Sequence, residues 1–266
     1  MVAAVMVTAG AVIAPSVVRA DPPSDALAYA VFAFQRASIG SKAQVQGDAG
    51  CLFDELSLGQ GTRVAGAAAA PTIRLRHGAR ASGGYFCSSI DGGGATCSTL
   101  PNPLVGAPAI VLVGPVSNAD VKADKHTKPT SPLAAGAYGT LEAGTAAEMN
   151  LAGGTYQFES IDVGSRGKLL CLAACDVTVR SRVRLGQAAR LGAVDSIPAS
   201  SATIRVAAQG ESTALDAKSR SQIRGTIYAP SADVRLGAAA KVSGALVGNT
   251  VSVSPRARLQ GPPSGS

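Results

Sequence analysis

The sequence of 266 residues contains no tryptophan, and aromatic residues make up only 4% of it. A globular core of ordinary shape usually needs large side chains to fill its volume, so this shortage disfavours a conventional compact domain. Alanine and valine dominate the apolar residues instead, and the chain has 31 glycines. Small and β-branched side chains can fill a narrow core that is built one layer at a time, as in proteins made of stacked repeats.

Residue types that carry metal or nucleophile chemistry are also scarce. The two histidines, His77 and His126, have no nearby partner in the sequence. The spacing Cys171-x3-Cys175 supplies only two ligands, which is too few for a structural zinc site. Serine chemistry would need a Gly-x-Ser-x-Gly motif, and the chain has none. The sequence therefore predicts no catalytic residue, no metal and no cofactor, in a protein that is not an enzyme.

One enzymatic alternative stays open. Polysaccharide-degrading enzymes of the pectin-lyase type use a stacked β architecture and need clustered carboxylates on one groove. Asp162 and Asp216 share one position of the repeat described below, and we expect them to lie several coils apart. That separation disfavours this alternative.

Residues 1–20 form an apolar run, MVAAVMVTAGAVIAPSVVRA, that is short for a bilayer span. Val18 and Ala20 fit the −3 and −1 positions of a signal-peptidase site, although no Lys or Arg precedes the apolar run. We predict that residues 1–20 are a signal peptide and that the protein is exported to the periplasm, the cell surface or the extracellular space. A retained membrane anchor is the alternative.

An exported chain meets oxidising conditions, in which cysteines pair. Cys87 and Cys97 flank the Gly-rich stretch SSIDGGGAT and are the best candidates for a disulfide. Cys171 and Cys175 bracket Leu-Ala-Ala and are candidates for a second bridge across one corner of the fold. Cys51 is left without a partner.

A short template recurs along the chain: apolar, any, apolar, often Gly, two free positions, small, any, apolar, any, often Gly. Its nine copies begin at Ala37, Leu56, Ile73, Leu141, Ile161, Val183, Leu215, Val234 and Val251. The seventh position is always small: Ala43, Thr62, Ala79, Ala147, Gly167, Ala189, Ser221, Ala240 and Ala257. Apolar residues two apart describe the inward face of a short strand. We expect the fourth-position glycine to supply a turn conformation that a side chain would penalise.

The repeat predicts an all-β solenoid, a single-stranded β-helix of about nine coils, over residues 37–261, with its handedness left open. Each coil would contain three short strands and three turns. A β-sandwich is the alternative, but its turns would recur about every 8–12 residues and would not require a small residue at one fixed offset.

Three segments depart from the template. Residues 21–36 are expected to form an N-terminal cap or a first strand, because solenoid ends need a cover against edge pairing. Residues 84–132 are expected to be a long loop insertion, with an exposed polar part at its end. Residues 262–266 are expected to be a disordered tail.

The chain is basic, with a formal net charge of +7, which indicates anionic partners. The eighth template position, which plays no part in aligning the copies, is Lys or Arg in six of the nine. These residues are Arg63, Arg80, Lys168, Arg190, Lys241 and Arg258. Because equivalent positions align along a solenoid, they predict a basic stripe that binds a polyanion. The alternative is a solvated face that only keeps the sheet soluble.

The composition also separates the possible partners. Nucleic acid is disfavoured because an exported basic surface without interleaved aromatic residues lacks the platforms on which bases stack. Anionic envelope polysaccharide or lipid head groups fit better. Self-association through the ends of the solenoid is a further possibility.

Two segments carry a resemblance. GTIYAPSADVRLGAAAKVSGALVG, residues 225–248, resembles the last coils of uncharacterised β-solenoid modules of exported bacterial proteins. LAGGTYQFESIDVGSRGKL, residues 151–169, looks like their internal coils. The coil pattern is also similar to that of bactofilin-like polymer-forming solenoids and of ice-binding β-solenoids.

The resemblance implies a non-enzymatic structural or surface-interaction protein of the bacterial envelope, with an anionic-glycan-binding module as the alternative. Ice-binding solenoids need a flat face of regularly spaced threonines. The outward second template position is charged and mixed instead: Ser38, Ser57, Arg74, Glu142, Asp162, Arg184, Asp216, Arg235 and Ser252.

Overall fold

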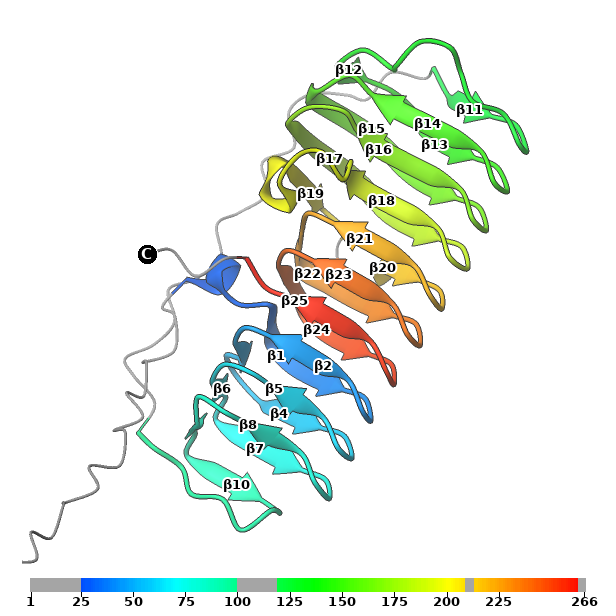
Figure 1. Ribbon diagram of the computed structural model, residues 1–266. Helices are drawn as coiled ribbons and strands as arrows, with labels where there is room; N and C mark the ends of the chain where they lie inside the picture. Colours follow the sequence, from blue (N-terminus) through cyan, green and yellow to red (C-terminus); the bar gives the residue numbers. More distant parts are fainter. Residues whose placement is uncertain (1–24, 100–118, 209–212, 263–266) are drawn as a thin grey trace, which may run out of the picture.

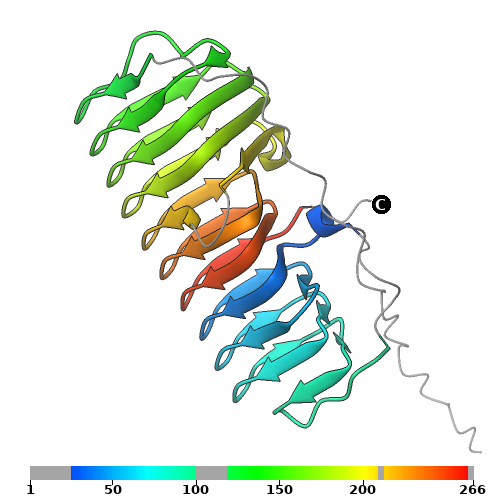
Figure 2. The same ribbon diagram turned by 180° about the vertical axis from the view of Figure 1, so that it is seen from behind.

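The computed structural model describes residues 25–99, 119–208 and 213–262. In these ranges, short parallel strands stack into an elongated β-solenoid (Figures 1 and 2). The all-β solenoid prediction is therefore confirmed. The predicted signal peptide at 1–20 and most of the predicted tail, 263–266, lie outside the described residues.

Each coil crosses three faces of the rod in turn. The first complete coil runs from the second half of β1 (Val31–Ile39) on face 1 to β2 (Gln44–Gln46) on face 2 and β3 (Ala49–Cys51) on face 3. β4 (Glu55–Leu58) then begins the next coil on face 1. Several strands, β1 among them, bend from face 3 onto face 1, so that one sheet covers both of these faces.

Two sheets follow from this arrangement. The sheet on face 2 contains, in spatial order, β14 (Glu148–Leu151), β16 (Lys168–Cys171), β18 (Arg190–Ala193), β21 (Gln222–Arg224), β23 (Lys241–Ser243), β25 (Arg258–Gln260), β2, β5 (Arg63–Val64) and β8 (Arg80–Ala81). The sheet on faces 1 and 3 has as its main path β10 (Ser89–Asp91), β7 (Thr72–Leu75), β4, β1, β24 (Leu246–Val253), β22 (Thr226–Leu236), β19 (Ala202–Val206), β17 (Cys175–Leu185), β15 (Gly154–Val163), β13 (Thr140–Ala143) and β11 (Val121–Ala123). Off this path lie β3, β6 (Ala68–Ala69), β9 (Tyr85–Phe86), β12 (Gly136–Ala137) and β20 (Thr213–Ala217). Two 3-10 turns, η1 (Ala26–Ala28) and η2 (Ala199–Ser201), complete the described elements.

The coils are not stacked in the order of the sequence. β1 pairs with β4 on one side and with β24 on the other, so the first and last coils are neighbours in the middle of the rod. Figure 1 shows this contact as blue strands beside red ones. From β1 the chain proceeds to one end of the rod at β10, resumes at the opposite end with β11, and returns to the middle at β24.

The predicted template is confirmed by the strand register. All nine template starts lie in one column on face 1, together with Ile90 and Val121 at its two ends. In spatial order the column reads Val121, Leu141, Ile161, Val183, Leu215, Val234, Val251, Ala37, Leu56, Ile73 and Ile90. We number these levels as rungs 1 to 11 in this order. The nine template residues of rungs 2 to 10 are almost completely buried and form the axis of the main core.

Two of the expected irregular segments contain rungs of the solenoid. The span 84–132, expected to be a loop, contributes β9 and β10 at one end and β11 at the other. The template missed both rungs because Gly92 replaces the apolar third position in one and Pro129 replaces the apolar ninth position in the other.

Of the two expectations for residues 21–36, an N-terminal cap or a first strand, the described residues show the first strand. Residues 21–24 lie outside the described part, and residues from Val31 onward form β1, which has neighbours on both sides in mid-rod. Before β1, Tyr29 packs on Phe32 with ring centroids 5.2 Å apart. Both rings belong to a small apolar cluster outside the main core, which also contains Phe34 and Tyr228. This cluster holds the start of the described chain against the middle of the rod.

The turn from face 1 to face 2 has the same geometry in successive coils. In the turn Gly237–Ala240, the N–H of Ala240 donates to the C=O of Gly237 at 3.2 Å. The sixth template position has a left-handed φ and is not glycine in eight turns, where φ is +55° to +62°. The fourth-position Gly237 lies outside the left-handed region, but a Cβ there would come within 2.5 Å of the backbone at Lys218 and Ser219. The expectation that the fourth-position glycine supplies a special turn conformation is therefore wrong. This glycine is needed because it permits close approach of neighbouring turns.

Candidate functional site

The six predicted stripe residues lie in one column along face 2. From rung 2 to rung 10 the eighth template position reads Glu148, Lys168, Arg190, Gln222, Lys241, Arg258, Gln44, Arg63 and Arg80. The cations therefore form three adjacent pairs, which Gln222 and Gln44 separate. The column crosses the junction between the last and first coils, where Arg258 is the neighbour of Gln44.

Most of these cations are unpaired within the described part of the chain. Lys168 is the exception, since its Nζ lies 2.9 Å from a carboxylate oxygen of Glu148. The second carboxylate oxygen of Glu148 lies 2.5 Å from Nζ of Lys128. Hydrogen bonds from the two lysines lower the pKa of the Glu148 carboxyl to about 2. The other five stripe residues are exposed and have no described acidic group within ion-pair distance.

A second set of cations lies at the same edge of the rod, at the sixth template position. Lys42, Arg166, Arg220 and Arg256 occupy this left-handed turn position and are all exposed. The turns are joined by hydrogen bonds, such as the one from the N–H of Arg256 to the C=O of Ser41 at 3.0 Å. Sequence reasoning missed these residues because the sixth position was treated as free. A signal was present, since four of the nine template copies carry Lys or Arg there.

Together the two columns place at least one cation on every rung from 3 to 10. We call this set the basic ridge: Arg166, Lys168, Arg190, Arg220, Lys241, Arg256, Arg258, Lys42, Arg63 and Arg80.

The eight segments of strand and turn that carry the ridge contain no acidic residue. The fourth to tenth template positions of these eight rungs contain thirteen of the 24 Lys and Arg residues of the chain and no Asp or Glu. These positions are residues 40–46, 59–65, 76–82, 164–170, 186–192, 218–224, 237–243 and 254–260. The segregation gives this edge of the rod a strongly positive field.

Face 1 carries charges of both signs instead. Several of its outward cations form ion pairs, including two between neighbouring strands: Arg74 with Glu55 at 3.1 Å and Lys122 with Glu142 at 3.5 Å. Asp162 and Asp216 lie only two rungs apart, because the register places Arg184 between them. The expectation that these two carboxylates lie several coils apart is wrong, since an interval of some 50 residues in the sequence corresponds to two long coils.

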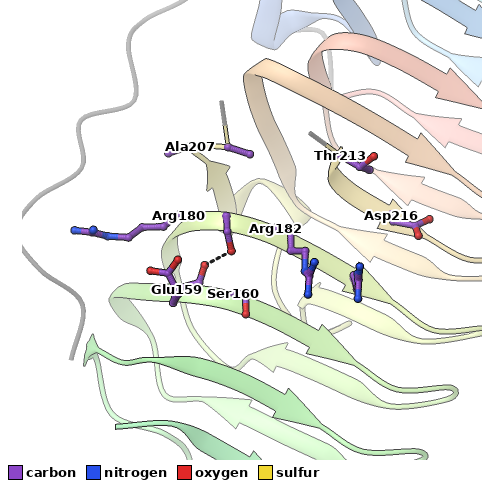
Figure 3. Close-up of a pocket in the computed structure, with 10 residues that line it drawn as sticks. Glu159, Ser160, Arg180, Arg182, Ala207, Thr213 and Asp216 are labelled. Carbon is purple, nitrogen blue, oxygen red and sulfur yellow. Dashed lines mark hydrogen bonds between the residues drawn. The ribbon is translucent and has the colours of Figure 1, made fainter. Parts of the chain in front are cut away.

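An open hollow of about 740 Å³ lies beside these residues, on rungs 3 to 5. It is lined by Glu159, Ser160, Arg180, Ser181, Arg182, Arg184, Ala207, Ala208, Thr213 and Asp216. Figure 3 shows the side chains of Arg180 and Arg182 extending in different directions. The hollow therefore mixes both signs of charge, and its labelled arginines do not converge on one point. We do not regard it as the principal site.

The cysteines divide into one bridge and three thiols. Cys87 and Cys97 form the predicted disulfide. The second predicted bridge is absent, because Cys171 and Cys175 are both free and buried. A thiol hydrogen bond joins these two residues in place of a covalent bond; it raises the pKa of Cys171, as burial also does, and lowers the pKa of Cys175. The remaining thiol, Cys51, is buried and donates to the C=O of Gln35 at 2.9 Å.

Two further searches bear on the site. Within residues 25–99, 119–208 and 213–262, no three His, Cys, Asp or Glu side chains are grouped so that they could hold a metal ion. No helix among the described elements is long and apolar enough to cross a membrane.

Comparison with known proteins adds a family match and two structural likenesses. The model of a domain of unknown function, DUF7305, matches residues 154–260. No curated protein matches the chain. A solved ice binding protein from an Antarctic biological consortium is similar with a TM-score of 0.44 and 14% identity, over 98% of this chain and 96% of that chain.

A second ice binding protein, from an Antarctic bacterium of the Flavobacteriaceae, has a TM-score of 0.33 and 12% identity, over 88% of this chain and 78% of that chain. These scores and identities are too low to carry the ligand of either protein over to this chain.

Proposed function

We propose that this protein is a non-enzymatic surface-interaction rod, exported to the bacterial envelope, that binds linear anionic polymers along the basic ridge. The observation that supports the proposal is the unbroken series of cations on rungs 3 to 10, with no acidic residue in the strands and turns that carry it. A face that only needed to stay soluble would be served equally well by mixed charges, such as those on face 1.

The summed field of the ridge supplies the binding energy in this proposal. Neighbouring rungs are about 4.8 Å apart, which is shorter than the Debye length of about 8 Å at physiological salt. Stacked cations at this spacing repel one another, and a bound polyanion relieves that repulsion. Each exposed ion pair contributes only about 0–1 kcal/mol, so the affinity comes from several contacts together and falls steeply with salt.

The chemistry of the ridge favours polysaccharide among the possible polyanions. The seven-residue segments that carry the ridge contain no Phe, Tyr or Trp, so they offer no platform on which nucleic acid bases could stack. Lipid head groups present their charge as a surface, whereas the ridge is a line of cations along one edge of a rod. An anionic envelope polysaccharide presents its charge as a line.

Retention on immobilised heparin and on immobilised lipopolysaccharide tests this function. In the stripe variant, Arg63, Arg190, Lys241 and Arg258 are replaced by Gln, the residue that rungs 5 and 8 already carry in this column. The control variant replaces the exposed face 1 residues Arg74, Arg182, Arg184 and Arg235 by Gln, which removes the same charge. We expect the stripe variant to elute at clearly lower salt than the control. Equal elution of the two variants would mean that the ridge only keeps the rod soluble.

A further inference from the structure

The two columns of the ridge complement each other rung by rung. At rungs 5 and 8 the eighth position is uncharged, being Gln222 and Gln44, and the sixth position is Arg220 and Lys42. At rungs 4, 6, 9 and 10 the sixth position is Ala188, Ala239, Gly61 and Gly78, and the eighth position carries the cation. No rung in this interval lacks a positive charge.

The backbone keeps these charges at one edge and at one spacing. The sixth and eighth positions flank the seventh, which is buried at seven of the eight rungs, so both side chains lie outside the core at the same corner. The left-handed turn residues are tied to the next turn by hydrogen bonds of about the same length, 2.8 Å from Lys42 to Gln60 and 2.9 Å from Arg220 to Ala238. The ridge therefore repeats with the strand spacing of about 4.8 Å.

The series continues across the junction of the two chain ends. Rung 7 comes from the last coil and rung 8 from the first, and the N–H of Arg256 donates to the C=O of Ser41 at this point. Eight rungs with seven intervals of about 4.8 Å span about 34 Å. Only the non-sequential stacking of the coils produces a ridge of this length.

Building on the proposed function, we propose that the ridge is matched in register to a linear polyuronate, a polysaccharide with one carboxylate on each sugar. A pyranose advances along its chain by a distance comparable to one rung, so each sugar would present its carboxylate to the cation of one rung. Beside the ridge, outward residues such as Gln46, Gln260 and Ser243 are neighbours on face 2 and offer hydrogen bonds to sugar hydroxyls. Denser polyanions, such as a nucleic acid strand with a charge about every 3.4 Å, do not keep this register.

The length dependence of binding is the first test. Oligogalacturonates of two to twelve sugars are titrated into the full chain by calorimetry at low salt. We expect the affinity to rise with each added sugar up to about eight, because each sugar adds one ion pair, and to level off beyond that length. A continued rise with no change near eight sugars would overturn the match in register.

A pair of double variants supplies the second test. Lys42→Gln with Arg220→Gln removes the ridge cations of rungs 5 and 8, so that the ridge keeps three separate runs of two charged rungs. Arg166→Gln with Arg256→Gln removes the same charge at the same left-handed turn position, but rungs 3 and 7 keep Lys168 and Arg258. For the eight-sugar oligomer, we expect the first variant to bind at least about threefold more weakly than the second, on the scale of one exposed ion pair.

The outcomes separate the two proposals. Equal weakening by the two double variants, with retention on heparin intact, would refute the register match and leave the proposed function standing. Failure of the wild-type chain to bind heparin, lipopolysaccharide and every oligogalacturonate would refute both. Recovery of shortened oligomers after incubation would instead show that the chain is an enzyme, which contradicts the proposed function.

Discussion

Exchanging glycine and alanine at two positions of one turn tests why the solenoid corner needs glycine at its fourth template position. In the turn Gly237–Ala240, the fourth template position is Gly237 and the sixth is Ala239, which has a φ of +56°. A Cβ added at Gly237 would lie 2.5 Å from the carbonyl carbon of Lys218 and from the N of Ser219, both backbone atoms of the neighbouring turn. Gly237→Ala must therefore displace a turn of the next rung, although Arg76, Lys218 and Ser254 show that some rungs adapt to a side chain at this position.

The two substitutions should have opposite effects. Overpacking with a backbone shift costs about 1–3 kcal/mol, so Gly237→Ala should lower the melting midpoint by about 2–12 °C in a chain of this size. Ala239→Gly removes the steric cost of about 1–2 kcal/mol that an L-residue has in the left-handed conformation. It also destabilises the fold by about 0.4–1 kcal/mol, because glycine gives the unfolded chain more entropy. Its net effect should be neutral to slightly stabilising.

Calorimetric melts of the two single variants beside the wild type measure both effects. Stability in a solenoid is close to a sum over neighbouring coils, so both changes probe the same local contacts. A destabilising Ala239→Gly together with a neutral Gly237→Ala would refute the reasoning, because a Cβ would then fit at the fourth position and the left-handed sixth position would gain nothing from glycine.

Three further predictions concern the core, the cysteines and acid stability. Ala240 is 1% exposed, so Ala240→Leu should overpack its coil by about 1–3 kcal/mol; an unchanged melting midpoint would contradict the inward register. Mass spectrometry of a non-reduced digest should find Cys87 joined to Cys97, and a thiol reagent should count three free thiols after denaturation, whereas a count of one would mean that a second bridge forms. The pKa of Glu148 is lowered in the folded state from 4.5 to about 2, so its ion pairs stabilise the fold above about pH 4.5 and are lost as the pH falls toward 2. The difference in melting midpoint between wild type and Glu148→Gln should shrink over that interval, and a constant difference would refute the assignment.

The repeat could be predicted from the sequence because the physics of one coil is local. A buried seventh position admits only a small side chain, and inward strand residues must be apolar, so both constraints appear in each copy from Ala37 to Val251. The end rungs depart from the pattern at Gly92 and Pro129, because a terminal coil has a neighbour on one side only and tolerates exceptions.

The sequence carries no such local pattern for the order in which the coils stack. Every copy presents the same parallel edge, so the coil at Ala37 can pair with the coil at Val251 as well as with the coil at Leu56. Local spacing therefore determines what a coil is and leaves its neighbours open. The complementary cations at Lys42 and Arg220 escaped notice for a related reason, since their role appears only when the columns are read in spatial order.

The salt dependence of binding to an oligogalacturonate of eight sugars tests the central claim most directly. Each neutralised charge on a single-stranded polyanion contributes about 0.7 to the slope of log K against log salt. Replacing Arg63, Arg190, Lys241 and Arg258 by Gln should therefore make the slope shallower by about three, while the control with Arg74, Arg182, Arg184 and Arg235 replaced keeps the wild-type slope. Equal slopes for the two variants would contradict the claim that the polymer lies on the ridge.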